Sequence, residues 1–381
     1  MAGATVTSAA CRAEHVGSLL RPAEVIEARA AHAAGRLTLA ALREIEDRAI
    51  LDALEQQRQA GLQVVTDGEL RRGTWLAYWW ESVEGMVALD TPSLRLEWQD
   101  VPDASISVDD MQLEPIAAGG ALRRKSPSLP EVEADFLAEN ATGPFKVTMA
   151  SATMTASLWV PGVSDGVYAS PEELVRGAVA LQIEEVESLL ERGVTWIQLD
   201  SLRYGTVIDE SFRRMMQQIG ADTDRVLEDT VAGDNAVIAA ARRKNPQVTV
   251  GVHFCRGNNR SAWLQTGGYE PVAERLFGEV DADRFLLEYD TERAGGFEPL
   301  RFVPPGKTVV LGLVSSKLPQ LESQDELRRR IDEAARFVPL ENLALSPQCG
   351  FASTAAGNLL TVDDQRRKLE LVVETAQQVW G

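Results

Sequence analysis

The chain has 381 residues, of which 45% are hydrophobic, so it can form one large domain or two ordinary ones with a substantial core. Its 38 lysines and arginines are outnumbered by 57 acidic residues, and the net charge of −19 argues against a nucleic-acid or anionic-membrane partner. Three cysteines without framework spacing, no basic-then-apolar leader and no membrane-length apolar run predict a protein of the reducing cytoplasm.

Short apolar, β-branched runs alternate with long amphipathic stretches along the chain. The predicted strands are 5–13, 62–66, 145–150, 195–200, 247–254, 284–289, 307–313 and 342–346. The predicted helices are 37–60, 171–192, 223–243, 270–280, 325–337 and 363–379. This alternation indicates parallel strands with crossover helices, and eight such units favour a closed (β/α)8 barrel. An open doubly wound sheet would give a similar rhythm, but no Gly-x-Gly-x-x-Gly follows the first strand.

Residues 75–128 break this alternation. They are rich in aromatic, acidic, proline and glycine residues. We predict a single barrel domain over 1–381, in which 75–128 is an insertion after the second strand that forms a hairpin over the barrel mouth. A contact between copies of the chain in a homo-oligomer, or simple packing, is an equally good role for the segment.

His253 and Cys255 stand at the end of a predicted strand, where residues two apart point to the same side. Both side chains can therefore reach one ion. Cys349 follows the last predicted strand, and Glu288 closes another. Zinc takes about four nitrogen, sulfur or carboxylate ligands, so these residues form a candidate site. Cysteines are also common core residues, and composition alone leaves that alternative open.

Other polar residues also stand at strand ends. They include His15, Ser18, Asp67, Glu69, Asp200 and Lys317. In a barrel, the carboxyl ends of all strands converge on one face, so these residues would surround one pocket. For any one acidic residue, a helix N-cap or a loop salt bridge is the alternative role.

Six of these segments together resemble a known family, the zinc-dependent, cobalamin-independent methionine synthases, and in particular their short, single-barrel, methionine synthase II-like members. The matching segments are His15-Val16-Gly17-Ser18, Val65-Thr66-Asp67-Gly68-Glu69, Ile197-Gln198-Leu199-Asp200, His253-Phe254-Cys255, Leu287-Glu288 and Ser346-Pro347-Gln348-Cys349-Gly350. The resemblance covers nearly the whole chain. It implies a (β/α)8 barrel of the methionine synthase C-terminal or uroporphyrinogen decarboxylase-like type.

The resemblance also implies roles for individual residues. The implied zinc ligands are His253, Cys255, Glu288 and Cys349. The implied substrate-binding residues are His15, Ser18, Glu69 and Asp200, with the segment from His15 to Ser18 at the amino acid's carboxylate and the two acids at its ammonium group. Asp200 and Lys317 are the candidate catalytic residues. The segment that carries a histidine proton donor in the family departs from the family here and contains Lys317, which could substitute for that histidine or be a solvated loop lysine.

Three functions follow as alternatives. The first is methyl transfer to homocysteine, giving methionine, from a methyltetrahydrofolate-like or other small methyl donor. The second is transfer of a different thiol to a non-folate electrophile, as in epoxyalkane:coenzyme M transferases, with a sulfonate clamp drawn from Arg21, Arg71, Arg256 and Arg260. The third is a non-catalytic barrel that binds metal or thiol. Trp79, Trp159 and Tyr204 are candidates for the pocket wall.

Overall fold

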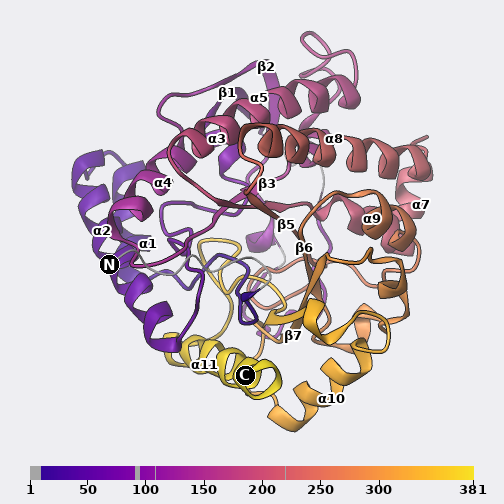
Figure 1. Cartoon of the computed structure of the whole chain (residues 1–381). Helices are drawn as coiled ribbons and strands as arrows, with labels where there is room; N and C mark the ends of the chain where they lie inside the picture. The colour runs from indigo at the N-terminus through magenta and orange to yellow at the C-terminus, as the bar shows by residue number, and fades with distance from the viewer. Residues whose placement is uncertain (1–9, 91–94, 108, 219) are drawn as a thin grey trace.

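The computed structural model describes residues 10–90, 95–107, 109–218 and 220–381. Six parallel strands pair in chain order to form one sheet at the centre of the molecule (Figure 1). They are β3 (Val147–Ala150), β4 (Trp196–Asp200), β5 (Thr249–Phe254), β6 (Arg284–Glu288), β7 (Thr308–Val314) and β8 (Leu343–Pro347). Each overlaps a predicted strand, so the prediction of parallel strands at these six positions is confirmed.

Single backbone bridges extend this sheet on both sides. Ala13 pairs in parallel with Leu345 of β8, and Val65 pairs in parallel with Phe145, just before β3. These bridges place the predicted first strand beside the last one and the predicted second strand beside the third. This is the neighbour relation of a (β/α)8 barrel, as predicted.

The predicted second strand, 62–66, is reduced to this one bridge for a local reason. The Gln57 side-chain amide donates to the Thr66 carbonyl oxygen at 2.9 Å and accepts from the Thr66 amide at 2.9 Å. A side chain therefore uses the backbone groups that a strand would offer to its neighbour. Of the predicted first strand, 5–13, residues 5–9 lie outside the described residues.

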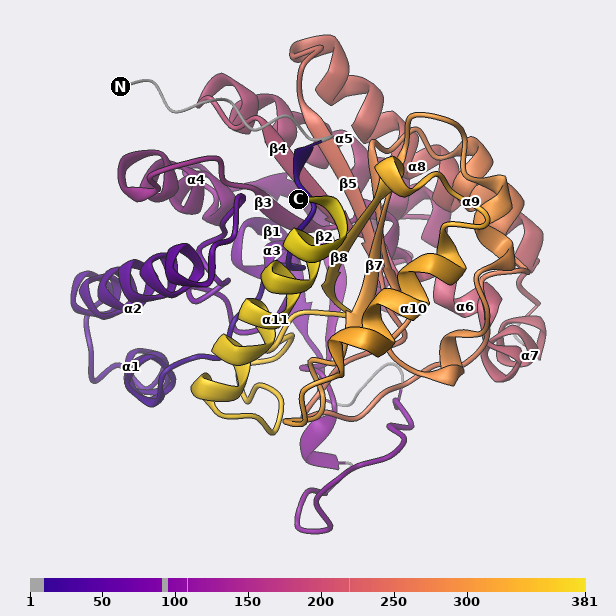
Figure 2. The same ribbon diagram turned by 60° about the horizontal axis from the view of Figure 1, so that its bottom comes forward.

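Helices surround the sheet in both views (Figures 1 and 2). Six overlap predicted helices: α2 (Leu39–Ala60), α5 (Pro171–Glu191), α8 (Thr223–Lys244), α9 (Ala273–Glu279), α10 (Gln324–Ala334) and α11 (Val362–Trp380). Five were not predicted: α1 (Ala23–Ala33), α3 (Tyr78–Glu81), α4 (Leu129–Asn140), α6 (Gly205–Ile208) and α7 (Glu210–Gln218). Among the described residues, no helix has the length and apolar character needed to cross a membrane.

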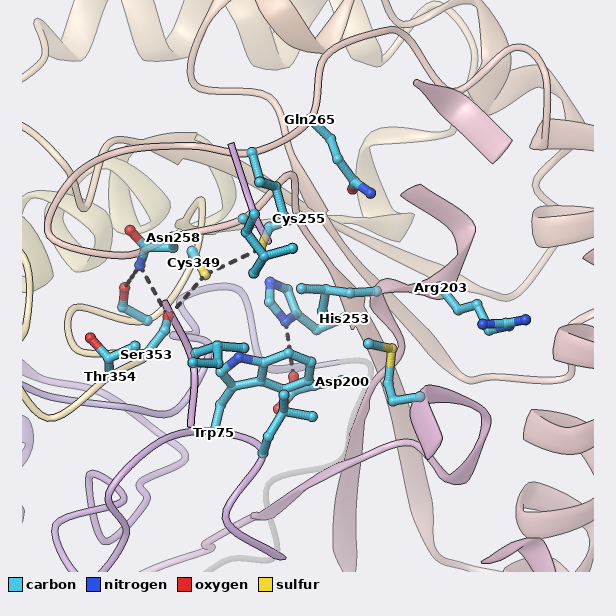
Figure 3. A pocket seen from close by; sticks show the side chains of 18 of the residues that line it. Trp75, Asp200, Arg203, His253, Cys255, Asn258, Gln265, Cys349, Ser353 and Thr354 are labelled. Atoms are coloured by element: carbon cyan, nitrogen blue, oxygen red, sulfur yellow. Dashed lines mark hydrogen bonds and ion pairs between the residues drawn. The ribbon is translucent and has the colours of Figure 1, made fainter. Parts of the chain in front are cut away.

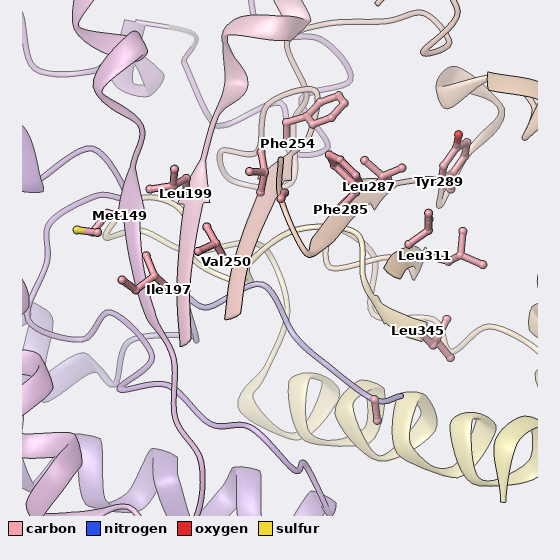
Figure 4. Packing of buried hydrophobic residues seen from close by; sticks show 14 of the residues in the cluster. Met149, Ile197, Leu199, Val250, Phe254, Phe285, Leu287, Tyr289, Leu311 and Leu345 are labelled. Atoms are coloured by element: carbon pink, nitrogen blue, oxygen red, sulfur yellow. The ribbon is translucent and has the colours of Figure 1, made fainter. Parts of the chain in front are cut away.

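Side chains along the strands alternate between two apolar layers. Phe254 and Leu287 belong to the large core that the strands share with the helices (Figure 4). Leu286 belongs instead to a small separate cluster with Val16, Val310 and Ala344. His253 pairs with Leu286 across the two strands, and Glu288 lies two residues after Leu286. Both polar residues therefore face the inner side of the barrel, above this small cluster.

Residues 75–128 contain a hairpin of their own. β1 (Val83–Ala88) and β2 (Ile116–Arg124) form an antiparallel two-stranded sheet, and β2 contacts α5. The connection between them projects at the bottom of Figure 2 and reaches the barrel where Gln99 pairs with Trp263. That the segment is an insertion in a single domain stays a prediction.

Candidate metal and substrate site

Three of the predicted metal ligands meet at the carboxyl ends of the strands (Figure 3). His253 is the penultimate residue of β5, Cys255 directly follows that strand, and Cys349 follows β8. One potential ligand atom of each lies within 4.8 Å of the other two, and all three residues are buried. The two-residue spacing of His253 and Cys255 brings both to the inner side, and barrel closure brings Cys349 beside them.

The two cysteine sulfurs are spaced to hold one cation between them. The Sγ atoms of Cys255 and Cys349 are 3.4 Å apart, and both cysteines are free. A disulfide would need about 2.05 Å, whereas the edge of a tetrahedron with zinc–sulfur bonds of about 2.3 Å is about 3.8 Å. Contact with Cys255 lowers the pKa of Cys349 well below its ordinary value, and contact with Cys349 raises the pKa of Cys255.

Asp200 fixes the His253 ring from the side away from the thiols. Asp200 Oδ1 lies 2.9 Å from His253 Nδ1 and accepts from Gln198 Nε2 at 2.9 Å. His253 Nε2 is buried and has no hydrogen-bond partner in the described part of the chain. Burial alone would lower the pKa of His253, but Asp200 and Cys349 raise it to about 10. A carboxylate on one ring nitrogen and an unused second nitrogen are typical of a metal-ligating histidine.

Glu288, the predicted fourth ligand, lies next to this group but is held by other partners. Because Phe254 pairs with Leu287, the next residue in register with Cys255 is Glu288. Glu288 Oε2 accepts from the Arg256 amide at 2.7 Å, and Oε1 is ion-paired with Arg293. The structure brings three of the four predicted donors together, and Glu288 as a ligand stays a prediction.

His253, Cys255 and Cys349 line a cavity of about 190 Å³. The predicted substrate-binding residues Ser18, Glu69 and Asp200 line the same cavity. Residues from five separate segments of the chain therefore share one space, as the convergence of strand ends predicts. The same cavity holds sulfur and imidazole donors on one part of its wall and two carboxylates on another.

Glu69 presents an unused carboxylate oxygen in this cavity. The Thr148 hydroxyl donates to Glu69 Oε1 at 2.8 Å, and Arg72 lies 3.8 Å from the same oxygen. Oε2 is buried without a hydrogen-bond partner in the described part of the chain. Burial raises the pKa of Glu69, although Arg72 opposes the shift. A carboxylate that is held through one oxygen and open at the other is suited to accept from a ligand's ammonium group.

Two other predicted site residues lie behind the cavity wall. His15 is buried, neither ring nitrogen has a hydrogen-bond partner among the described residues, and burial lowers its pKa to about 3, so the ring is neutral. Lys317 is also buried, and its Nζ donates at 3.3 Å to Asn258, which lines the cavity. Substrate binding by His15 and proton transfer by Lys317 stay predictions.

The aromatic residues that line the cavity differ from the predicted ones. Trp79 belongs to a separate apolar cluster with Trp159 packed against it, and the Tyr204 hydroxyl donates to Asp234 at 2.9 Å. None of the three expected aromatics lines the cavity, whose aromatic residues are Trp75, Trp98 and Phe212. Trp75 and Trp98 belong to 75–128, and the aromatic richness of that segment was the one sequence signal for them.

The prediction of an arginine clamp in the cavity is also wrong. Arg21, Arg71, Arg256 and Arg260 do not line the cavity. Arg21 and Arg256 donate to backbone carbonyl oxygens, and Arg71 is ion-paired with Asp47. The arginine in the cavity wall is Arg203, which follows β4 and makes no side-chain hydrogen bond or ion pair in the described part of the chain. Its position after a strand end was a signal that the sequence analysis did not use.

Residues 12–378 match the sequence profile of the family described as cobalamin-independent synthase, catalytic domain. The chain belongs to this family. The cobalamin-independent synthases are methyltransferases, so the chain is an enzyme of that class. The resemblance that the sequence motifs indicated is thereby confirmed.

Individual relatives agree with this assignment. The uncharacterized protein YxjH of Bacillus subtilis is 36% identical over 373 residues, which cover 97% of this chain and 94% of YxjH. A putative vitamin-B12 independent methionine synthase from Listeria monocytogenes has a similar structure, with a TM-score of 0.73, 28% identity and full coverage of both chains. The 5-methyltetrahydropteroyltriglutamate–homocysteine methyltransferase of Vibrio vulnificus is 22% identical over 94% of this chain but only 42% of its own length.

Proposed function

We propose that this member of the cobalamin-independent synthase family is a zinc-dependent thiol methyltransferase that converts homocysteine to methionine. One observation carries the proposal: the same cavity contains the His253, Cys255 and Cys349 group and the carboxylates of Glu69 and Asp200. Two thiols and an imidazole are donors that zinc prefers, and a pair of carboxylates suits an ammonium group. An amino acid with a terminal thiol meets both requirements.

In this proposal His253, Cys255 and Cys349 hold the zinc ion, and Glu288 is the fourth ligand. Two observations support the fit: Nε2 of His253 has no hydrogen-bond partner among the described residues, and the two sulfurs are 3.4 Å apart. Bound zinc would lower the pKa of a substrate thiol so that a thiolate is present near neutral pH. Asp200 keeps the ring of His253 oriented, because it engages the other nitrogen.

The remaining residues bind the substrates and move a proton. Ser18 would hold the carboxylate of homocysteine, and Glu69 with Asp200 would hold its ammonium group. The methyl donor, a methyltetrahydrofolate or another small donor, would lie against the apolar wall that Trp75 and Trp98 form. When the methyl group leaves, the donor atom keeps the bonding electrons and needs a proton, for which Lys317 is the candidate, since its Nζ lies at the cavity wall beside Asn258.

Replacing Glu69 with alanine tests the ammonium site. We expect homocysteine to bind more weakly by about 1 to 3 kcal/mol, the scale for losing a charged hydrogen-bond partner. Zinc content should stay unchanged, because Glu69 is not part of the group of potential metal ligands. Calorimetric titration and metal analysis measure the two quantities, and unchanged homocysteine affinity would contradict the assignment.

Arg203 supports a second candidate, in which the thiol carries a sulfonate instead of an amino acid group. Arg203 makes no side-chain hydrogen bond or ion pair among the described residues, and only the more distant charges of Glu172 and Asp229 act on it, so it can pair with an anionic ligand. Titrating the zinc-loaded protein with homocysteine and with 2-mercaptoethanesulfonate separates the two candidates. We expect homocysteine to bind at least about tenfold more tightly, equivalent to 1.4 kcal/mol. The reverse order would replace the first candidate with the second.

A further inference from the structure

The carboxylate of Glu288 faces the metal-binding side of the barrel but is turned to two other partners. Its register position is beside Cys255, on the inner side of the sheet. Nevertheless, Oε2 accepts from the Arg256 amide at 2.7 Å and Oε1 is ion-paired with Arg293. A carboxylate that can bind either a metal ion or a guanidinium group has two competing positions.

Arg293 is shared between two buried carboxylates. Besides its ion pair with Glu288, its Nη2 lies 4.0 Å from Asp290 Oδ1. Neither oxygen of Asp290 accepts a hydrogen bond, and Nε of Arg293 donates none, within the described part of the chain. Asp290 is only 1% exposed, and the Arg293 guanidinium lies over the Trp263 ring at 4.9 Å. The charge of Lys317 acts on both carboxylates, but the guanidinium pairs directly with Glu288 and leaves Asp290 without a hydrogen bond among the described residues.

This imbalance has a physical consequence. A buried polar group without a partner costs about 1 to 3 kcal/mol, and more when it is charged. Turning Glu288 away from Arg293 would release the guanidinium to pair fully with Asp290. The loss of one ion pair would then be offset by the gain of another, so the two arrangements lie closer in energy than the rupture of a single buried ion pair would suggest.

We propose that Arg293 is a positioning residue that holds Glu288 when this carboxylate is off the metal, and that Asp290 receives Arg293 when Glu288 is on it. The inference rests on the proposed function, since it assumes that Glu288 is the fourth ligand. A thiol that took the place of Glu288 would give its proton to solvent, and the exchange of one anionic donor for another would leave the charge of the donor set unchanged. Arg293 therefore favours thiol binding by stabilising the displaced carboxylate.

Replacing Arg293 with methionine tests this directly, because it keeps an apolar stem over Trp263 and removes the charge. In the full-length protein, we expect the affinity for Co²⁺, measured by chelator competition, to rise about tenfold, since Glu288 loses its competing partner. The affinity for homocysteine, read from the Co²⁺ absorption spectrum, should fall by a similar factor. A purely structural role for Arg293 would instead weaken metal binding, and a lower or unchanged Co²⁺ affinity overturns the inference.

Two further variants keep the test decisive. Asp290→Asn removes the alternative partner of Arg293, so it should shift both affinities in the opposite direction, and it serves if the arginine variant does not fold. Glu288→Gln should weaken Co²⁺ binding and abolish the effect of Arg293→Met in the double variant. If Glu288→Gln leaves the Co²⁺ spectrum and affinity unchanged, the proposed fourth ligand itself is wrong. If Glu288→Gln weakens Co²⁺ binding but Arg293→Met has no effect, Glu288 remains the fourth ligand and only the positioning role of Arg293 is wrong.

Discussion

Replacing Cys349 with serine should leave the purified protein almost free of zinc and reduce its methyltransferase activity to background. Cys349 supplies one of two sulfurs that stand 3.4 Å apart, and a hydroxyl is a much poorer zinc ligand than a thiolate. Since loss of an outer hydrogen-bond partner already costs about 10 to 100-fold in metal affinity, we expect loss of a ligand to cost more. Metal analysis and a homocysteine methylation assay measure both effects.

Cys11 offers a matched control for this experiment. It is a fully buried cysteine in a small apolar cluster with Val64 and Trp196, apart from the cavity. Burial raises its pKa to about 11, so its thiol stays protonated near neutral pH. Cys11→Ser should keep its zinc and its activity, with only a loss of stability. Full zinc content and activity in Cys349→Ser would contradict the proposed metal site.

Replacing Asp200 with alanine should weaken both metal and substrate binding. The His253 ring would lose the partner of its Nδ1 atom, which is 2.9 Å away, and we expect zinc affinity to fall by about 10 to 100-fold. Homocysteine binding to protein saturated with zinc should also weaken by about 1 to 3 kcal/mol, because one of the two carboxylates for its ammonium group is gone. Chelator competition and calorimetric titration separate the two losses.

Glu185 provides the control for removing a buried carboxylate. It lies in α5, accepts from the Ser128 hydroxyl at 2.6 Å and does not line the cavity. Glu185→Gln should lower the thermal unfolding midpoint and leave zinc affinity unchanged. If Asp200→Ala behaves in the same way, the carboxylate does not orient His253.

The strands were predictable because their signal is local. β5 and β7 are short, largely apolar runs rich in valine that are buried throughout, and such runs indicate parallel strands without knowledge of their neighbours. The segment 62–66 is also rich in β-branched residues but pairs at one residue, because the side chain of Gln57 takes both backbone hydrogen bonds of Thr66. That competition depends on how α2 packs, and periodicity cannot reveal it.

Only those parts of the candidate site that depend on local strand geometry were predictable from the sequence. The spacing of His253 and Cys255 follows from strand geometry alone, so their shared direction could be read from the sequence. The partner of Glu288 could not be predicted, because Arg293 reaches it from a three-residue 3-10 helix (Glu292–Ala294) that is too short to give a periodic pattern. The family resemblance indicated which residues belong together, whereas the hydrogen bonds of Asp200 and the exclusion of Trp79 from the cavity required the packed structure.

The residues that line the cavity come from two different parts of the fold. The cavity's chemical groups, such as His253, lie at the ends of barrel strands, whereas Trp75 and Trp98 come from the segment 75–128, whose two strands form a separate sheet. Under the proposed function, a change of Trp75 or Trp98 would alter the wall against which the alkyl donor lies and leave the metal-binding and thiol-binding residues in place. We therefore expect differences in the donor among such enzymes to concentrate in 75–128.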